Sequence, residues 1–230
     1  MTSQEQCQPN LTICAIEGNI GAGKSTLLER KAFSDKTVQE PLEVWNRFTN
    51  EDGASVLDAF YSNPSKYAFL FQILALTSRV ESLRNRIILE TQKQSNTDEK
   101  SDILLLTERS PQADKHVFAS MLLPDNSLEQ QVYHYVFSVF QTLFPRMKPD
   151  HTVLLQSDVA TCASRIRKRN RPGEENIDQG YLQNLNNGYQ KMFASIPPAA
   201  QSLIDSNGSI AETELALQKA LDNLQQKDQS

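Results

Sequence analysis

The sequence contains few cysteines, no long apolar run and no excess of positive charge. Its three cysteines, Cys7, Cys14 and Cys162, form neither a CxxC pair nor a metal-binding spacing. Scattered cysteines in an odd number argue against a disulfide framework and favour a reducing compartment. No apolar stretch approaches the roughly 20 residues that span a membrane. We therefore expect no membrane partner.

The charge and the first residues limit the function further. The formal net charge is −5, which argues against a protein whose main task is to coat nucleic acid. Residues 1–6 are polar and acidic, without the apolar core of a signal peptide or the arginines of a mitochondrial transit sequence. These features predict a cytoplasmic protein.

The length and composition are those of one globular domain. The chain has 230 residues, of which 39% are hydrophobic and 22% charged. Such values predict a single domain over residues 1–230 with an ordinary core. We expect flexible ends at residues 1–10 and 225–230.

Short apolar runs alternate with helical patterns along the chain. Continuous apolar runs of this length are typical of strands buried on both faces of a parallel sheet, and parallel strands need helical crossovers. The sequence therefore predicts an α/β fold. The expected strands are residues 11–16, 37–40, 103–106, 152–155 and 202–205, and the clearest helices are residues 64–92 and 128–144.

The second helical stretch, residues 128–144, is rich in aromatic residues, which favours a place in the core or at a dimer interface over contact with a ligand. Residues 93–102 are polar without periodicity and read as a solvated loop.

A glycine-rich motif follows the first expected strand. It satisfies G-x-x-x-x-G-K-[ST], and a helix starts inside it, as in phosphate-binding loops. Glycines let backbone N–H groups curl around a polyphosphate, and the helix N-terminus adds favourable dipole charge. We expect Lys24 to bridge the β- and γ-phosphates and Ser25 to bind Mg²⁺. The motif consists of Gly18, Asn19, Ile20, Gly21, Ala22, Gly23, Lys24, Ser25 and Thr26.

The loop alone does not distinguish a GTPase, an ATPase motor and a small-molecule kinase. The sequence has neither an Asn-Lys-x-Asp guanine motif nor an Asp-x-x-Gly switch, which counts against a GTPase. Glu40 and the pair Glu108 and Arg109 follow expected strands, and parallel sheets bind ligands at the carboxyl ends of their strands. One carboxylate there suits a proton acceptor, another a metal ligand, and the arginine suits a transferring phosphoryl group. Singly, each is equally explained as a surface ion pair.

A basic cluster at residues 165–171 precedes Pro172 and Gly173. It is compatible with a nucleic-acid patch or targeting signal, with a solvated helix face, or with an arginine lid over a triphosphate. The phosphate loop and the negative net charge favour the lid, formed by Arg165, Arg169 and Arg171.

The chain resembles the deoxyribonucleoside kinases related to deoxycytidine and deoxyguanosine kinase. The matching motifs occur in the family's order, from about residue 11 to residue 205. The elements that carry the resemblance are the phosphate loop, Glu40-Pro41 with Trp45, Phe71-Gln72, and Glu108-Arg109-Ser110 followed by Asp114 and Phe118. The resemblance implies a P-loop kinase fold with a five-stranded parallel sheet flanked by helices, an arginine-rich lid and a homodimer. It also implies ATP or another triphosphate as donor, with Mg²⁺.

The resemblance further implies a role for each matching residue. Glu40 is the expected general base, with Arg109 and Lys24 as catalytic partners, while Ser25 and Glu108 hold the metal. Tyr61 and Glu174, or its neighbour Glu175, hold the sugar 3′-hydroxyl. The remaining implied contacts are Trp45, Leu57, Phe71, Gln72, Ala75, Arg79, Asp114 and Phe118 for the nucleoside, and Asp205 with the lid arginines for the donor.

Together these features predict phosphorylation of the 5′-hydroxyl of a deoxyribonucleoside. An Arg79–Asp114 pair would fill the space that a thymine methyl group needs, so deoxycytidine and purine deoxynucleosides are favoured over thymidine. The alternatives are a kinase for nucleoside monophosphates or thymidine, and a nucleotide-dependent protein that binds nucleic acid. The last would bind polynucleotide with a steep dependence on salt.

Overall fold

A single parallel sheet forms the centre of the molecule. A computed structural model describes residues 10–95, 101–171 and 173–227. The sheet has five parallel strands, as the sequence predicted, and their order is β2-β3-β1-β4-β5. The strands are β1 (Leu11–Gly18), β2 (Thr37–Val38), β3 (Ile103–Glu108), β4 (His151–Gln156) and β5 (Gln201–Asp205).

The strand register brings the ends of the central strands together. Ile16 of β1 is the partner of Glu108 in β3 and of Val153 in β4. These strands are apolar on both sides because helices cover both faces. The residues that follow β1, β2 and β3 consequently meet at one edge of the sheet, the edge at which open α/β sheets bind ligands.

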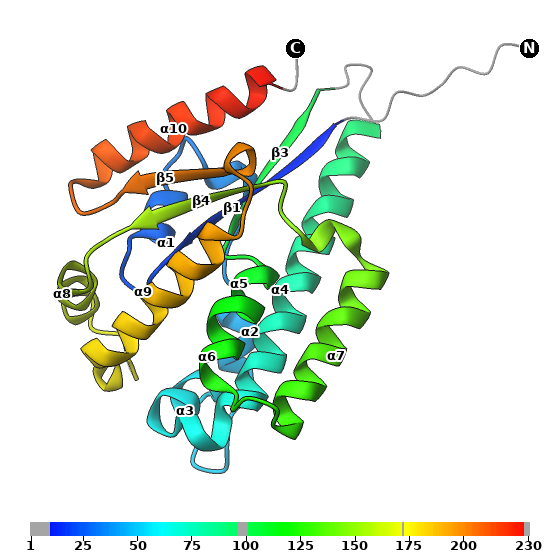
Figure 1. The fold of residues 1–230 in the computed structure, drawn as a ribbon. Helices are drawn as coiled ribbons and strands as arrows, with labels where there is room; N and C mark the ends of the chain where they lie inside the picture. The colour runs from blue at the N-terminus through cyan, green and yellow to red at the C-terminus, as the bar shows by residue number, and fades with distance from the viewer. Residues whose placement is uncertain (1–9, 96–100, 172, 228–230) are drawn as a thin grey trace, which may run out of the picture.

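Helices connect each strand to the next one along the chain. The longest, α4 (Pro64–Ser95), lies beside α7 (Leu128–Leu143) (Figure 1). A π-helical segment at Asp114–Ala119 joins two short helices, α5 (Pro111–Ala113) and α6 (Ser120–Leu122). The others are α1 (Lys24–Leu28), α2 (Leu42–Arg47), α3 (Val56–Ser62), α8 (Val159–Arg169), α9 (Gln179–Ala194) and α10 (Ile210–Lys227), with 3₁₀ turns at Ser34–Lys36, Pro145–Met147, Glu174–Asn176 and Pro198–Ala200.

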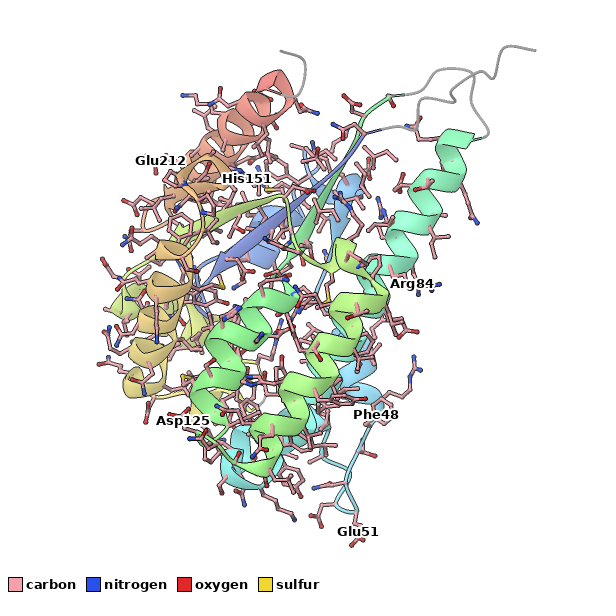
Figure 2. The ribbon with its side chains drawn as sticks, turned by 45° about the vertical axis from the view of Figure 1, so that its right-hand side comes forward. Phe48, Glu51, Arg84, Asp125, His151 and Glu212 are labelled. Carbon is pink, nitrogen blue, oxygen red and sulfur yellow. The ribbon has the colours of Figure 1, made fainter. Side chains whose placement is uncertain are left out.

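The helices form layers around the sheet. In Figure 1, α10 lies above β4 and β5, and α9 lies below them. The loop from α2 to α3 carries Glu51 to the lower tip of the molecule, whereas the strand residue His151 lies in its upper part (Figure 2). None of the helices in the described ranges combines the length and the apolar character of a membrane span.

Two helices were predicted with bounds, and both begin where expected, α4 at Pro64 and α7 at Leu128. Helix α7 ends at Leu143, one residue before its predicted end. Helix α4 continues to Ser95, three residues beyond the predicted end and into the loop expected over residues 93–102, of which 96–100 lie outside the described residues. Residues 225–227 continue α10, although we expected them to fray. Residues 1–9 and 228–230 lie outside the described residues, and the single-domain organisation stays a prediction.

Two large apolar clusters fill the molecule. One lies between the sheet and α1, α8, α9 and α10, and the other surrounds α3, α4 and α7. The aromatic face of α7 belongs to the second cluster, where Tyr133 and Phe137 are buried. Tyr135 lies on the other side of the helix and is 70% exposed. The core explanation of the aromatic pattern is therefore correct for the buried face.

Candidate active site

A cavity of about 220 Å³ lies where the carboxyl ends of the strands meet. The phosphate loop forms one wall, α3 and α4 another, and the residues after β3 and α8 complete it. Most residues predicted from the sequence meet here. They are Ile20, Gly21, Gly23, Lys24, Ser25, Thr26, Glu40, Trp45, Leu57, Tyr61, Phe71, Gln72, Ala75, Arg79, Glu108, Arg109, Asp114, Phe118, Arg169, Arg171 and Glu174.

The phosphate loop has a backbone that only glycine accommodates at two positions. Gly21 has a φ of 80°, and a Cβ atom added there would lie 2.6 Å from the carbonyl oxygen of Cys162. Gly18 has a φ of 144°, and its Cβ would lie 2.7 Å from the carbonyl oxygen of Leu155. Both contacts are with backbone, so a side chain would displace the loop from β4 or α8. The motif is thus explained by close packing as well as by phosphate binding.

Asn19 attaches this loop to the rest of the fold. Its Nδ2 donates to the carbonyl oxygen of Leu182 in α9 at 2.8 Å, and its Oδ1 accepts from the N–H of Ile20 at 2.8 Å. Ala22, also a residue of the loop, is buried. Neither Asn19 nor Ala22 lines the main cavity, and the contacts of Asn19 are those of an anchor for the loop backbone.

Lys24 lies buried at the base of the loop. Its Nζ donates to the carbonyl oxygens of Gly18 at 3.1 Å and Asn19 at 2.9 Å. Burial and the charge of Arg109 lower the pKa of Lys24 to about 7, although nearby acids oppose the change. A bound phosphate would favour the ammonium form, because an adjacent negative charge raises the pKa of an amine.

Ser25 and Glu108 form the candidate metal centre. Ser25 Oγ donates to Glu108 Oε1 at 2.7 Å. Burial and then the charge of Glu40 raise the pKa of Glu108. A hydroxyl and a carboxylate suit Mg²⁺, which takes few protein ligands and completes its shell with water and phosphate oxygens. Within the described ranges, no group of three His, Cys, Asp or Glu side chains offers an all-protein metal site.

Glu40 lies in the cleft between two arginines. It follows β2, and its Oε1 accepts from Arg109 Nε at 2.9 Å and from Arg79 Nη2 at 3.2 Å. Burial alone would raise the pKa of Glu40, but Arg109 and Arg79 outweigh it and lower the pKa to about 2. Glu40 is therefore an ionised carboxylate at neutral pH.

Arg109 connects three parts of the site. Its Nη1 donates to the carbonyl oxygen of Gly18 at 2.9 Å and contacts Tyr189 Oη of α9. The guanidinium carbon lies 4.9 Å from the centre of the Phe118 ring. The backbone of Arg109 is left-handed, with a φ of 63°. Such strain in a residue with a large side chain is concentrated at functional sites.

The inner end of the cavity combines an ion pair with an amide. Arg79 Nε donates to Asp114 Oδ2 at 2.8 Å, and both side chains are buried. Gln72 lines the same cavity and is also buried, and its Oε1 has no hydrogen-bond partner among the described residues. Buried polar atoms are nearly always paired, so this oxygen is suited to a ligand that donates a hydrogen bond.

Aromatic rings and small residues shape the walls of this end. The Phe71 ring stacks on Phe60 with centroids 4.9 Å apart and meets the edge of Trp45 at 5.2 Å. Trp45 Nε1 donates to Ser78 Oγ at 2.9 Å, which fixes the indole. The remaining predicted wall residues, Leu57, Ala75 and Phe118, also line the cavity. A flat ring fits such a slot.

Tyr61 and Glu174 lie together near the outer end of the cavity. Burial and the neighbouring Glu174 carboxylate raise the pKa of Tyr61, which keeps its hydroxyl protonated. Glu174 is buried, whereas Glu175 is exposed, so only Glu174 lines the cavity. Arg169 Nε donates to Glu174 Oε2 at 2.7 Å.

Two predicted donor-binding residues lie elsewhere. Arg165 lines an adjoining cavity of about 470 Å³ behind the loop, where its guanidinium donates to the carbonyl oxygens of Asn207 at 3.3 Å and Gly208 at 3.2 Å. Asp205 ends β5, and its Oδ1 accepts from the N–H and Nδ2 of Asn207. Asp205 lines neither of these two cavities, so the structure does not place its side chain with the loop.

Some residues of the site were not predicted from the sequence. Glu29 and Leu42 line the main cavity, and Tyr189 contacts Arg109 from α9. Glu17 and Ser110 are buried beside the loop, where Ser110 Oγ donates to Glu17 Oε1 at 2.6 Å. Glu17 directly precedes the phosphate loop and Ser110 belongs to the Glu108-Arg109-Ser110 element, which are usable signals, but nothing in the sequence of α9 points to Tyr189.

The phosphate loop, the ionised acid after β2 and the five-stranded parallel sheet together define a kinase with the P-loop fold. The sequence matches the deoxynucleoside kinase family over residues 13–226, and the chain belongs to that family.

Three relatives illustrate the range of the family. Deoxycytidine kinase 2 of Gallus gallus is 32% identical over 200 residues, which cover 77% of this chain and 72% of that protein. Deoxycytidine kinase of Homo sapiens is 30% identical over 190 residues, covering 74% and 71%. Thymidine kinase of Ictalurid herpesvirus 1 is 30% identical over 197 residues, covering 81% and 76%. The relatives agree on nucleoside phosphorylation and differ in the nucleoside that they are named for.

Proposed function

We propose that this protein transfers the γ-phosphate of ATP to the 5′-hydroxyl of deoxycytidine and purine deoxynucleosides, in preference to thymidine, as a step of nucleotide salvage. The observation that carries the proposal is the ionised carboxylate of Glu40, which lines the same cavity as Lys24 and Ser25. A proton acceptor and a phosphate loop on one cleft are the two groups that transfer to an alcohol requires.

In this mechanism each residue has one task. Glu40 accepts the proton of the 5′-hydroxyl, and Lys24 holds the β- and γ-phosphates. Arg109, with the lid residues Arg169 and Arg171, stabilises the charge on the transferring phosphoryl group. Mg²⁺, held by Ser25 and Glu108, would neutralise phosphate charge. Tyr61 and Glu174 hold the 3′-hydroxyl and so orient the 5′ end of the sugar.

The donor needs more than the loop. We retain Arg165 and Asp205 as proposed donor contacts: Arg165 lies in the adjoining cavity that shares Gly21, Gly23 and Thr26 with the main one. Contact of Asp205 with the donor requires its carboxylate to leave Asn207. Rearrangement of the loop after β5 on binding would supply that change.

The base preference follows from the inner end of the cavity. Gln72 offers an acceptor and a donor side by side, which matches the hydrogen-bonding edge of cytosine or adenine. The Arg79–Asp114 ion pair lines the same cavity as Gln72, and we propose that it would exclude a thymine methyl group. A thymidine kinase among the relatives makes this preference the part of the proposal that most needs measurement.

The charges in the cleft argue against the alternative acceptors. A nucleoside monophosphate would bring its phosphate against the Glu40 carboxylate, and the nearby Arg79 and Arg109 are already paired with that carboxylate. The net charge of −5 argues against a nucleic-acid partner, and Arg165 and Arg169 of the basic cluster contact residues of this chain. We therefore propose a nucleoside acceptor and no nucleic-acid partner.

We also propose a homodimer formed through α4 and α7. One stripe of exposed residues along α7 is apolar, and α4, which packs against α7, exposes Ile88 and Leu89. Surface apolar stripes of this extent mark protein interfaces. The exposed residues of α7 are Leu128, Val132, Tyr135, Val139 and Leu143. A cytoplasmic location is proposed as well, since Cys14 and Cys162 are free and buried, as expected in a reducing compartment.

A substrate screen tests the proposal. Purified protein would be incubated with Mg²⁺ and γ-labelled ATP against the four deoxynucleosides and their monophosphates. We expect labelled monophosphates from deoxycytidine, deoxyadenosine and deoxyguanosine, little product from thymidine, and none from the nucleotides. Faster turnover of a monophosphate or of thymidine would refute the proposed acceptor.

A further inference from the structure

We propose that Glu17 is a positioning residue for the phosphoryl transfer: through Ser110 it holds the backbone of Arg109, and so aims the guanidinium at Glu40 and the phosphate loop. The inference rests on the proposed function, because it assigns Glu17 to the same reaction. No motif considered above gives Glu17 a task, although it directly precedes the loop.

Glu17 is a fully buried acid with one strong hydrogen bond. It is the penultimate residue of β1, its exposed fraction is 0%, and its Oε1 accepts from Ser110 Oγ at 2.6 Å. Its Oε2 is buried and has no hydrogen-bond partner among the described residues. Burial raises the pKa of Glu17. A buried acid with an unpaired oxygen costs stability, which indicates a function other than stability for the side chain.

Ser110 transmits the position of Glu17 to a strained residue. Arg109, the preceding residue, has a φ of 63°. Its N–H donates to the carbonyl oxygen of Ile16 at 3.1 Å, and its carbonyl oxygen accepts from Thr107 Oγ1 at 2.8 Å. Those two bonds hold Arg109 on its β1 side and on its β3 side, and the Glu17–Ser110 bond fixes the chain immediately after it. A sparsely populated backbone conformation persists only where its neighbours determine it in this way.

Consecutive residues of β1 are thus bonded to consecutive residues after β3. Glu17 accepts from Ser110, and Gly18 accepts from Arg109 Nη1 at 2.9 Å. Gly18 opens the phosphate loop, and the same guanidinium donates through Nε to Glu40. A rotation of the Arg109 backbone would therefore move the guanidinium away from both the loop and Glu40. Small displacements of this kind reduce catalytic rates strongly without abolishing binding.

Three substitutions separate the hydrogen bond from the volume of the side chain. Ser110→Ala removes the donor, together with the bond that Ser110 Oγ accepts from the Ala113 N–H at 3.2 Å. Glu17→Met removes only the acceptor, at similar volume, and leaves that bond in place. Glu17→Gln keeps an acceptor oxygen. We expect the first two to lower kcat for deoxycytidine about 10- to 100-fold with each KM changed by less than about threefold. We expect Glu17→Gln to retain most of the activity. The matched control is Ser202→Ala, which removes a side-chain hydrogen bond between β4 and β5 and leaves kcat unchanged.

A double-mutant cycle distinguishes positioning of Arg109 from a general structural role. If Ser110 acts through Arg109, Ser110→Ala changes kcat by less than about twofold in an Arg109→Ala background, because residues that act as a unit are not additive. The full 10- to 100-fold loss in that background, or normal kcat in Ser110→Ala alone, would overturn the proposal.

A crystal structure of Ser110→Ala provides a readout that does not depend on turnover. We expect Arg109 to leave its positive φ or its contact with Glu40. An unchanged Arg109 would overturn the positioning role whatever the kinetics show. Failure of the wild-type protein to phosphorylate any deoxynucleoside would refute the proposed function instead. The crystal structure of Ser110→Ala would still show whether the Glu17–Ser110 hydrogen bond holds Arg109 in place.

Discussion

Arg109 Nε lies 2.9 Å from Glu40 Oε1, and this ion pair joins the residue that follows β3 to the loop that follows β2. Both side chains line the cavity of the phosphate loop. The pair keeps Glu40 ionised and orients it, while Arg109 remains in contact with the first residue of the loop. One guanidinium therefore contacts both the proposed proton acceptor, Glu40, and the start of the phosphate loop.

Arg109→Met should lower kcat by about 10²- to 10³-fold, which is the usual cost of losing one fixed donor to transition-state charge. The KM for ATP should change far less, since Lys24 and the loop backbone still hold the triphosphate. Steady-state kinetics with deoxycytidine and ATP measure both constants. A larger effect on KM than on kcat would place Arg109 in ground-state binding instead.

Because the pKa of Lys24 is lowered, we predict that the protein takes up a proton when the donor binds. With its pKa at about 7 in the empty site, Lys24 is mostly neutral at pH 8. A triphosphate favours the ammonium form, so binding at pH 8 should take up about one proton, and affinity should fall as the pH rises above 7. Calorimetry in buffers of different ionisation enthalpy measures the uptake.

Lys24→Met supplies the control for this measurement. It should bind the donor weakly and without the proton uptake of the wild-type protein. An equal uptake in both proteins would assign the proton to another group and contradict the burial effect on Lys24.

The preference for deoxycytidine over thymidine should weaken when the Arg79–Asp114 ion pair is removed. Arg79 and Asp114 must be replaced together, because Asp114 alone would be left buried without its ion pair. Arg79 alone would keep its contacts with Glu40 and with the carbonyl oxygen of Glu108. Arg79→Met with Asp114→Ala should raise kcat/KM for thymidine relative to deoxycytidine by about tenfold or more, the discrimination that one methyl-sized contact supplies. Competition between the two nucleosides in one reaction measures the ratio. An unchanged ratio would show that other residues set the preference.

The dimer should dissociate when its apolar face is charged. Tyr135 and Leu143 are 70% and 76% exposed on α7. Tyr135→Glu with Leu143→Glu should convert a dimer into a monomer in sedimentation analysis, because two or more charges would be buried at the interface. Gln141→Glu adds a charge on another exposed face of the same helix and should leave the dimer intact. A monomeric wild-type protein would refute the proposed assembly.

The fold and the family were predictable from short patterns. The apolar runs place β1, β3 and β4 because buried parallel strands read as continuous apolar segments, and the loop motif carries its own conformational demand at Gly21. The resemblance supplied the cavity residues but left Glu174 and Glu175 open. Burial of one and exposure of the other, set by the turn after α8, distinguish the two in space.

Other features required the three-dimensional structure. Tyr189 reaches Arg109 from a helix whose pattern predicts only packing, so no local signal marks it. Arg165 belongs to the predicted lid, but its position on α8 directs it toward the turn after β5, where backbone carbonyls accept its hydrogen bonds. Glu17 directly precedes the phosphate loop, and the loop motif gives roles to the residues after Glu17 but none to Glu17 itself. Long-range contacts of this kind depend on the register of β1 against β3, which composition and periodicity do not specify.

The rate of the Glu40→Gln variant tests the central claim most directly. The amide keeps the size of the side chain but cannot accept a proton, so kcat for deoxycytidine should fall by about 10²- to 10⁴-fold, the range for loss of a general base. The KM for ATP should stay within about threefold, because the phosphate loop is intact. Turnover close to that of the wild-type protein would contradict the account, since Glu40 would then not be the group that activates the 5′-hydroxyl.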